Sequence, residues 1–249
     1  MEKTGLTALL EAVVVVAPAK LTLSLRVTGV RPDGYHLIDA EMVSVDLCDT
    51  LTFADGDGLT VTGVPIPGGP SDDNLVTKAL RAVGRTAHVT LDKQIPAGAG
   101  LGGGSSDAAG VLRWAGVDDN DLAVRLGGDV PFCVRGGRAR VTGIGEILEA
   151  LPHVEATYTL LTPPLHVSSA AVYRKWDDLG GPTAEGPNDL EPAALAVCPE
   201  LVGYRDQLGN ATGVTPILAG SGATWFVPGA FRETGRVVTT LPASSPGRP

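Results

Sequence analysis

A glycine-rich run, IPAGAGLGGGSSDAAG at residues 95–110, most constrains how this chain folds. Five of the seven residues from Gly98 to Gly104 are glycine, between a strand-like and a helix-like segment. Glycine permits positive φ and close backbone approach, so successive N–H groups can point into one concavity. A helix beginning near Ser105 would add to this concavity its free N–H groups and the positive end of its dipole. The pattern predicts a phosphate loop in which Ser105 and Ser106 cap the helix, donate to phosphate or help hold Mg²⁺. The alternative is a flexible loop before a serine-capped helix.

Three well-known glycine-loop patterns fit this run poorly. A Walker A loop needs a lysine after its last glycine, and none follows here. The V-A-I-K and H-R-D partners of a protein-kinase glycine loop are absent from the sequence. Gly98, Gly100 and Gly103 satisfy G-x-G-x-x-G, but Asp118 and Asp119 fall between two helix-like stretches rather than after a strand. A dehydrogenase therefore stays only as a rival hypothesis.

Composition and charge limit the class of protein. The 249 residues suffice for one large domain or two small ones, and 43% are hydrophobic, which supports a folded core. A net charge of −9 gives no general attraction for nucleic acid, so a bound anion needs a local site. No stretch approaches the roughly 20 apolar residues that cross a bilayer, and the N-terminus lacks signal-peptide features. We expect a cytoplasmic monomer or weak homodimer without nucleic-acid or membrane partners.

Cysteine and histidine spacing gives no sign of a metal centre. The three cysteines are odd in number and far apart, which predicts free core thiols rather than disulfides. The four histidines show no metal-ligand spacing. No metal ligands are therefore expected among these cysteines and histidines.

Hydrophobic periodicity predicts strands and helices in mixed order. Residues 12–28 are expected to form two strands broken near APAK, with AVVVVA buried, and a strand is expected to begin at Val130. Asp73 is the expected cap of the helix in DNLVTKALRAV, and Ser168 or Ser169 that of the helix in VSSAAVYRKWDDL. The mixture indicates an α+β fold rather than a doubly wound sheet, with a boundary near residue 150.

The loop and three other parts of the chain resemble one superfamily of kinases. PAGAGLGGGSSDAA is similar to the P-x-x-x-G-L-G-S-S-A-A loop of the GHMP kinases, which include galactokinase, homoserine, mevalonate and phosphomevalonate kinases. APAKL followed by RPDGYH resembles in particular the 4-diphosphocytidyl-2-C-methyl-D-erythritol kinases. LGGDVPFCVRGGRARVTGIGEIL, GPNDLEPAA and LAGSGATWF are similar to further segments of that family, in the same order. The resemblance therefore covers most of the chain.

This resemblance implies a fold, a reaction and cofactors. It implies the GHMP kinase two-domain α+β fold, with a ribosomal protein S5 domain 2-like ATP-binding domain at 1–150 and a ferredoxin-like domain at 151–249. It implies transfer of the γ-phosphoryl group of ATP, with Mg²⁺, to the 2-hydroxyl of 4-diphosphocytidyl-2-C-methyl-D-erythritol. That reaction belongs to the non-mevalonate route to isoprenoids. The expected partner is thus a small molecule that carries a cytidine diphosphate group.

The resemblance also assigns a catalytic pair, Lys20 and Asp129. A carboxylate at Asp129 is suited to accept the hydroxyl proton, and an ammonium group beside it offsets developing charge. From the residues alone, the more common interpretation of Asp129 is a turn aspartate that caps local N–H groups, and that of Lys20 is a strand-edge lysine that reaches water.

Two further sets of residues follow from the resemblance. The family's tyrosine–histidine motif helps to hold the cytidine end of the substrate, and a tyrosine face can stack on a base. The residues expected at the nucleotide are Asn74, Lys93, Pro96, Ala97, Gly98, Ala99, Gly100, Leu101, Gly102, Gly103, Gly104, Ser105 and Ser106. Those expected at the substrate are Thr22, Tyr35, His36, Tyr173, Gly220 and Ser221. As ordinary structural residues, Asn74 would be a helix-start amide and Lys93 an exposed strand lysine.

The chain departs from the family pattern at two places. Thr22 stands where the family has asparagine. The threonine offers a hydroxyl group but lacks the longer reach of the asparagine amide. The span from Ser106 to Asp129 is shorter than is usual, so a helix there is expected to be trimmed. These departures leave two alternatives open: another GHMP kinase, of the homoserine or mevalonate type, and a non-catalytic nucleotide-binding relative.

Overall fold

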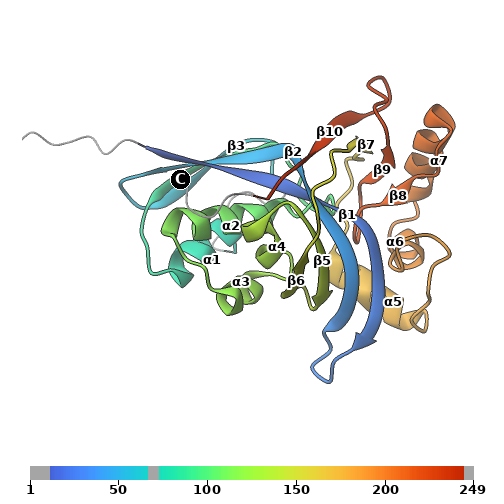
Figure 1. The fold of residues 1–249 in the computed structure, drawn as a ribbon, viewed down its shortest axis with the longest axis horizontal. Helices are drawn as coiled ribbons and strands as arrows, with labels where there is room; N and C mark the ends of the chain where they lie inside the picture. Colours follow the sequence, from blue (N-terminus) through green and yellow to red (C-terminus); the bar gives the residue numbers. More distant parts are fainter. Residues whose placement is uncertain (1–11, 67–72, 244–249) are drawn as a thin grey trace, which may run out of the picture.

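The structure is a computed structural model that describes residues 12–66 and 73–243. These residues form a mixed α+β fold, as the sequence predicted, and their strands join in one extended, twisted sheet (Figure 1). The strands are β1 Val13–Val30, β2 His36–Ala54, β3 Gly58–Gly63, β4 His88–Lys93, β5 Arg138–Gly143, β6 Ile147–Ala150, β7 Thr157–Leu161, β8 Ile217–Leu218, β9 Trp225–Pro228 and β10 Arg236–Leu241. The helices are α1 Leu75–Ala82, α2 Gly103–Ala115, α3 Asn120–Leu126, α4 Val130–Arg135, α5 Ser169–Asp178, α6 Glu191–Val197 and α7 Leu201–Thr212.

A long antiparallel hairpin of β1 and β2 is the backbone of the sheet. The predicted break near APAK is wrong, because β1 continues through Pro18 with a register shift between Pro18 and Ala19. Proline is tolerated there because a β-bulge leaves one residue unpaired in the hydrogen-bond ladder, and proline has no N–H group to donate. The prediction that AVVVVA is buried is also wrong. Val14 and Val16 are 54% and 52% exposed, and only the alternate face reaches the core.

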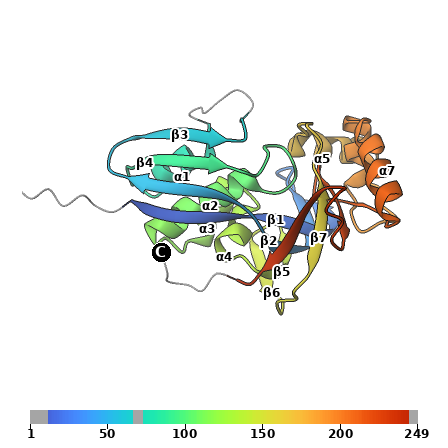
Figure 2. The same ribbon diagram turned by 90° about the horizontal axis from the view of Figure 1, so that it is seen from above.

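The last strand, β10, connects the two halves of the chain. The sheet runs β3-β4-β2-β10-β7-β9-β8, with β1 and β5 also paired to β2. β10 pairs Thr240 with Val45 of β2 and Val238 with Tyr158 of β7. Helices α1–α4 lie with the first six strands, and α5 and α7 lie at the opposite end of the molecule (Figure 2). A division at residue 150 would fall between β6 and β7, but it stays a prediction, because β10 returns across it.

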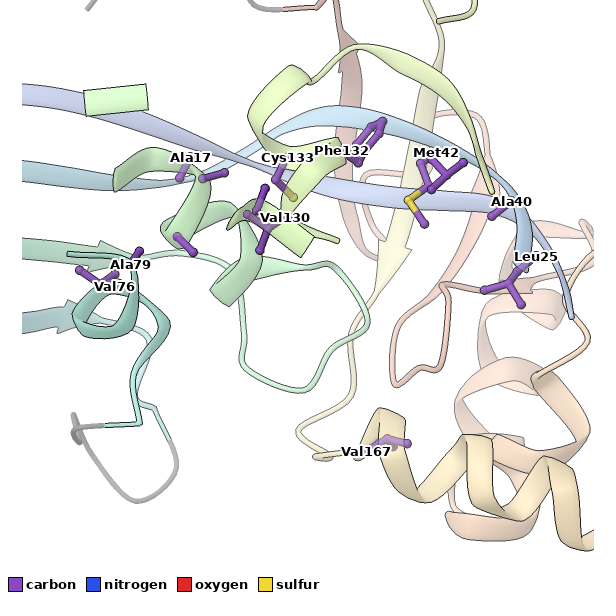
Figure 3. Close-up of a cluster of buried hydrophobic side chains, with 14 of the residues drawn as sticks. Ala17, Leu25, Ala40, Met42, Val76, Ala79, Val130, Phe132, Cys133 and Val167 are labelled. Carbon is purple, nitrogen blue, oxygen red and sulfur yellow. The ribbon is translucent and has the colours of Figure 1, made fainter. Parts of the chain in front are cut away.

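Helix α4 replaces a predicted strand directly after Asp129. The valine and phenylalanine of VPFCV favour a strand locally, but Pro131 occupies the first turn of a helix, where a missing N–H costs nothing. Val130 and Phe132 are fully buried and Cys133 nearly so, and Figure 3 shows them beside Ala17 of β1. Packing against the sheet and α2 thus overrides local strand propensity.

The described helices are short, and their caps differ partly from expectation. Ser168 caps α5 by accepting from the N–H of Ala171 at 3.4 Å, as one of the two predictions had it. Asn74 rather than Asp73 caps α1, accepting from Val76 at 2.9 Å. Within residues 12–66 and 73–243, none of the helices has the length and apolar character needed to cross a membrane.

A buried carboxylate fastens β1 to the second half of the chain. Asp189 is 2% exposed and accepts from the side chain of Arg26 at 2.7 Å and from the N–H groups of Val27 and Ala184 at 3.0 and 2.9 Å. Its own N–H donates to the carbonyl of Leu25 at 2.9 Å. These bonds hold the segment before α6 against the middle of β1, close to Lys20 in sequence.

Replacing this carboxylate tests how strongly the two halves are joined. Asp189→Asn should lower the free energy of unfolding by about 2–3 kcal/mol, since hydrogen bonds to a buried charged acceptor are lost. Urea denaturation followed by circular dichroism measures it. Asp206→Asn, which removes an exposed carboxylate paired with Arg205, should change the value by under about 0.5 kcal/mol. Equal effects of the two substitutions would contradict this account.

Candidate active site

The glycine loop connects β4 to α2 and lies against both β1 and the β8–β9 turn. Gly98, Gly100 and Gly102 all have positive φ, at 71°, 76° and 67°. The N–H of Lys20 donates to Leu101 at 3.0 Å, and the N–H of Thr224 donates to Ala99 at 3.0 Å. The side chains of Ala99 and Leu101 are buried with those of Leu21 and Ala219, so these two residues anchor the loop.

Neighbouring groups leave no room for side chains at three of these glycines. A Cβ at Gly98 would overlap the ring of His166, and one at Gly100 would overlap the carbonyl oxygen of Ala219. A Cβ at Gly102 would lie 2.7 Å from Cγ of Lys20. Tight packing as well as ligand approach therefore requires glycine here.

The start of α2 fits an anion. Its N-cap is Gly102 and it carries no side-chain cap, so its first N–H groups are available to a ligand. The predicted start near Ser105 and the predicted serine caps are wrong. Ser106 is fully buried, and its hydroxyl donates to the carbonyl of Pro18 at 2.7 Å, so only Ser105 of the two keeps a hydroxyl that can meet phosphate or Mg²⁺.

Lys20 and Asp129 form an ion pair beside this loop. The Lys20 Nζ and Asp129 Oδ2 atoms are 3.3 Å apart, with the amine side chain 6% exposed and the carboxylate side chain 33% exposed. The same Nζ donates to Oγ1 of Thr22 at 3.0 Å. Lys20 therefore does not reach into water, and Asp129 makes no side-chain cap bond to α4. The two purely structural interpretations of these residues are wrong.

The predicted Gly-Ser-Gly turn packs directly against Lys20. A Cβ at Gly220 would lie 3.2 Å from Nζ of Lys20 and 3.6 Å from Oγ1 of Thr22. Ser221 is 8% exposed, and its hydroxyl is 2.7 Å from that of Ser169 on α5. The turn thus forms one wall of the site beside Lys20.

Asn188 of the NDLE segment holds this turn in place. It is 1% exposed, and its amide donates to the carbonyls of Leu218 and Gly220 at 2.8 and 2.6 Å. Its Oδ1 accepts from the N–H of Leu190 at 2.9 Å. In the sequence, NDLE is only a mark of family resemblance, and Asn188 has no predicted position in the site.

A buried ion cluster supports the loop from below. Lys93 is 3% exposed, and its ammonium group pairs with Asp49 and, at 2.7 Å, with Asp107. Asp49 also accepts from the N–H groups of Gln94 and Ile95 at 2.5 and 2.8 Å. The interpretation of Lys93 as an exposed strand lysine is wrong. Its contact with the nucleotide stays a prediction.

Asp107 is the least satisfied member of this cluster. Among the residues that the structure describes, its Oδ1 is a buried side-chain atom without a hydrogen-bond partner. Burial raises the pKa of Asp107 to about 7, against the opposing charge of Lys93 and with a smaller contribution from Asp49. Burial likewise raises the pKa of the Cys133 thiol to about 12, so this cysteine behind Asp129 is unreactive.

The predicted cytidine residues lie at the far end of the β1–β2 hairpin. Tyr35 is 60% exposed. The ring of His36 lies 4.7 Å from that of Tyr173, and its Nε2 is 2.9 Å from Oδ1 of Asp177. Burial first, and then the charge of Asp129, raise the pKa of Tyr173. His36 and Tyr173 are therefore brought together, whereas Tyr35 faces solvent.

Asn74 and His166 complete the surroundings of the loop. Asn74 is the helix-start amide of α1, and a Cβ at Gly104 would lie 3.4 Å from the adjoining Leu75, so Asn74 is near the start of α2. His166 is exposed beside Gly98. Nothing in the sequence marked His166, because its contact with the loop arises only from the path between β7 and α5.

Comparison with known proteins now decides the family. A family model described as GHMP kinases N terminal domain matches residues 74–137. The 4-diphosphocytidyl-2-C-methyl-D-erythritol kinase of Cereibacter sphaeroides is 38% identical over 263 residues, which cover 93% of this chain and 95% of that protein. The chain belongs to this kinase family. A crystal structure of a 4-(cytidine 5'-diphospho)-2C-methyl-D-erythritol kinase superposes with a TM-score of 0.72 at 32% identity, covering 93% of this chain and 100% of the other.

A more distant likeness shows the shared fold alone. The homoserine kinase of Cytophaga hutchinsonii superposes with a TM-score of 0.56 at 15% identity, covering 99% of this chain and 98% of the other. The expected GHMP kinase fold is thereby confirmed. Membership of the kinase family, with its higher identity, disfavours the homoserine, mevalonate and dehydrogenase alternatives.

The close approach of the loop to the β8–β9 turn can be tested in this kinase by enlarging one glycine. Gly100→Ala should displace the turn from Lys20 and lower kcat about 100-fold, because small misplacements near reacting groups are costly. Gly116, at the end of α2, also has positive φ, but a Cβ there would have nothing within 4 Å. Gly116→Ala should cost about 1–2 kcal/mol of stability from backbone strain and leave kcat unchanged. Steady-state kinetics measures kcat and urea denaturation measures stability. Equal kcat values for the two variants would refute this account.

The raised pKa of Asp107 predicts a pH-dependent stability. Its pKa rises from 3.8 when unfolded to about 7 when folded, so the folded state binds more protons between those values. The contribution of Asp107 therefore falls as pH rises through this window. Relative to the wild type, Asp107→Asn should gain up to about 1.4 kcal/mol per pH unit from about pH 4 to 7 and nothing more above about pH 8. Urea denaturation at each pH measures the free energy of unfolding of both proteins. A difference between them that stayed constant from about pH 4 to 8 would exclude this shift.

Proposed function

We propose that this chain transfers the γ-phosphoryl group of ATP to the 2-hydroxyl of 4-diphosphocytidyl-2-C-methyl-D-erythritol. Family membership supports a kinase with ATP as the phosphate donor. The observation that carries the residue-level proposal is the Lys20–Asp129 ion pair beside the uncapped start of α2. Phosphoryl transfer needs chiefly positioning, charge stabilisation and an acceptor for the hydroxyl proton, and this arrangement offers all three.

Asp129 is the proposed general base. Its carboxylate is one-third exposed and free of a helix-capping bond, so it is open to a substrate hydroxyl. The buried ammonium group of Lys20 pairs with this carboxylate and offsets negative charge as the proton leaves the alcohol. Thr22 orients the amine by accepting from it at 3.0 Å, which gives the threonine in place of the family's asparagine a positioning role.

The glycine loop and the start of α2 are the proposed phosphate site. Backbone N–H groups between Gly98 and Ser105 would hold the β- and γ-phosphates, because glycines at positive φ allow successive N–H groups to point into one concavity. The hydroxyl of Ser105 lies 3.6 Å from where a Cβ on Gly127 would be, on the side that leads to Asp129. The hydroxyl of Ser105 is therefore suited to help hold Mg²⁺, which, when bound, would neutralise phosphate charge.

The hairpin end and α5 are the proposed site for the cytosine base. Tyr35 offers an exposed face, while Tyr173 is already packed against His36. Stacking on such rings and pairing with a histidine or its backbone suits a base. In this proposal Asn74 and Lys93 lie toward the adenosine of ATP. A cytoplasmic monomer or weak homodimer remains the expected form.

The base assignment is tested by changing one carboxylate. Asp129→Asn should lower kcat by at least about 1,000-fold with ATP affinity nearly unchanged, since the proton acceptor is lost while the phosphate loop is intact. Product formation from ATP and the cytidylyl substrate, and ATP titration, measure both. Asp118→Asn, at an exposed position, is the control and should behave like the wild type. Wild-type protein that bound ATP without phosphorylating the substrate would favour a non-catalytic relative.

A further inference from the structure

A cavity of about 270 Å³ lies between the end of the β1–β2 hairpin and helix α3. The hairpin contributes Arg31, Asp33 and Tyr35, α3 contributes Arg125, and the far wall contains Gly128. Gly128 directly precedes Asp129. The cavity therefore runs from the exposed tyrosine proposed for the base to the backbone beside the proposed general base.

The position of this cavity matches the middle of the proposed substrate. That molecule has a base at one end, the reacting alcohol at the other and a diphosphate between them. We propose that the cavity binds this diphosphate and that Arg125 is its principal cation. The inference rests on the proposed function, because that function places the base at Tyr35 and the alcohol at Asp129.

The charges around the cavity favour an anion. The Arg31 guanidinium is 2.7 Å from the Asp33 carboxylate, so these two groups nearly cancel. The side chain of Arg125 makes no hydrogen bond or ion pair with any of the residues in 12–66 and 73–243. Its guanidinium is thus an uncompensated positive charge in a chain of net charge −9. Asp129 lies one residue beyond Gly128, and the ammonium group of Lys20 pairs with it.

Helix α3 holds Arg125 at the cavity by contacts at its other end. Asp119 caps the helix by accepting from the N–H of Leu122 at 2.9 Å. The side chain of Asn120 donates to the carbonyl of Glu146 at 3.1 Å. Glu146 in turn accepts from the N–H of Ile144, which lines the cavity. The helix and the opposite wall are therefore one connected unit.

A guanidinium group is well suited to this ligand. Its planar donors can make two parallel bonds to phosphate oxygens, and it stays charged at every physiological pH. The α3 segment belongs to the shortened span between Ser106 and Asp129. Arg125 thus gives this span a role in selecting substrates that carry a diphosphate.

Titration of fragments of the substrate tests the inference directly. Calorimetry should show cytidine diphosphate binding to Arg125→Gln about 10-fold more weakly than to the wild type, as expected when one charge-assisted contact is lost. Cytidine, which lacks the diphosphate, should bind both proteins equally. Arg125→Lys should recover part of the loss, since it restores charge but not the paired donors. Arg232→Gln, at a position between β9 and β10 and away from the cavity, is the matched control and should change neither affinity.

Steady-state kinetics separates this inference from the proposed function. With a functional kinase, Arg125→Gln should raise KM for the cytidylyl substrate about 10-fold, with kcat and KM for ATP unchanged. Equal affinity of both proteins for cytidine diphosphate, or an equal loss for cytidine and its diphosphate, would overturn the role of Arg125. Absence of turnover in the wild type would instead overturn the proposed function, while the calorimetric comparison would still report on the cavity.

Discussion

The burial of one ammonium group, that of Lys20, organises the site. Its stem leaves room only for glycine at Gly102, and its Nζ meets Asp129, Thr22 and the turn at Gly220. A buried charge needs close partners because desolvation is costly. The strand, the loop, the α4 start and the β8–β9 turn must therefore all lie within reach of one atom. That requirement couples the folding of both halves of the chain to the geometry needed for phosphoryl transfer.

Two buried polar clusters hold these parts in position. Lys93 with its two carboxylates supports the loop from below, and Asn188 and Asp189 fasten the turn and β1 from the other side. Each cluster fixes part of the backbone that surrounds the ion pair of Lys20. Hydrogen-bonded and ion-paired networks of this kind favour one arrangement of the backbone over its alternatives, even with Oδ1 of Asp107 lacking a partner among the described residues. These contacts within the chain therefore hold the loop and the turn beside Lys20.

Local patterns predicted the elements that depend on local physics, and failed where packing decides. The glycine loop, the α5 cap and most strands follow from residue type and period. The segment after Asp129 was expected to be a strand but packs as α4 around Phe132. The structural alternative for Lys93, an exposed strand lysine, failed because the side chain is buried among carboxylate partners from other segments. Strand β10 was not foreseen, since its pairing with β2 and β7 is entirely non-local.

By itself, the sequence determined which chemistry the chain carries: a glycine loop before a helix, a lysine, an aspartate and the tyrosine–histidine motif in a kinase-like order. These follow from spacing within single segments, where the covalent chain limits the geometry. Only the tertiary structure decided that Lys20 lies 3.3 Å from Asp129 and that the hydroxyl of Ser106 donates to the carbonyl of Pro18. It also decided that Arg125 lines the cavity with Tyr35. Contacts between residues far apart depend on how the whole sheet twists and packs, which no local pattern contains.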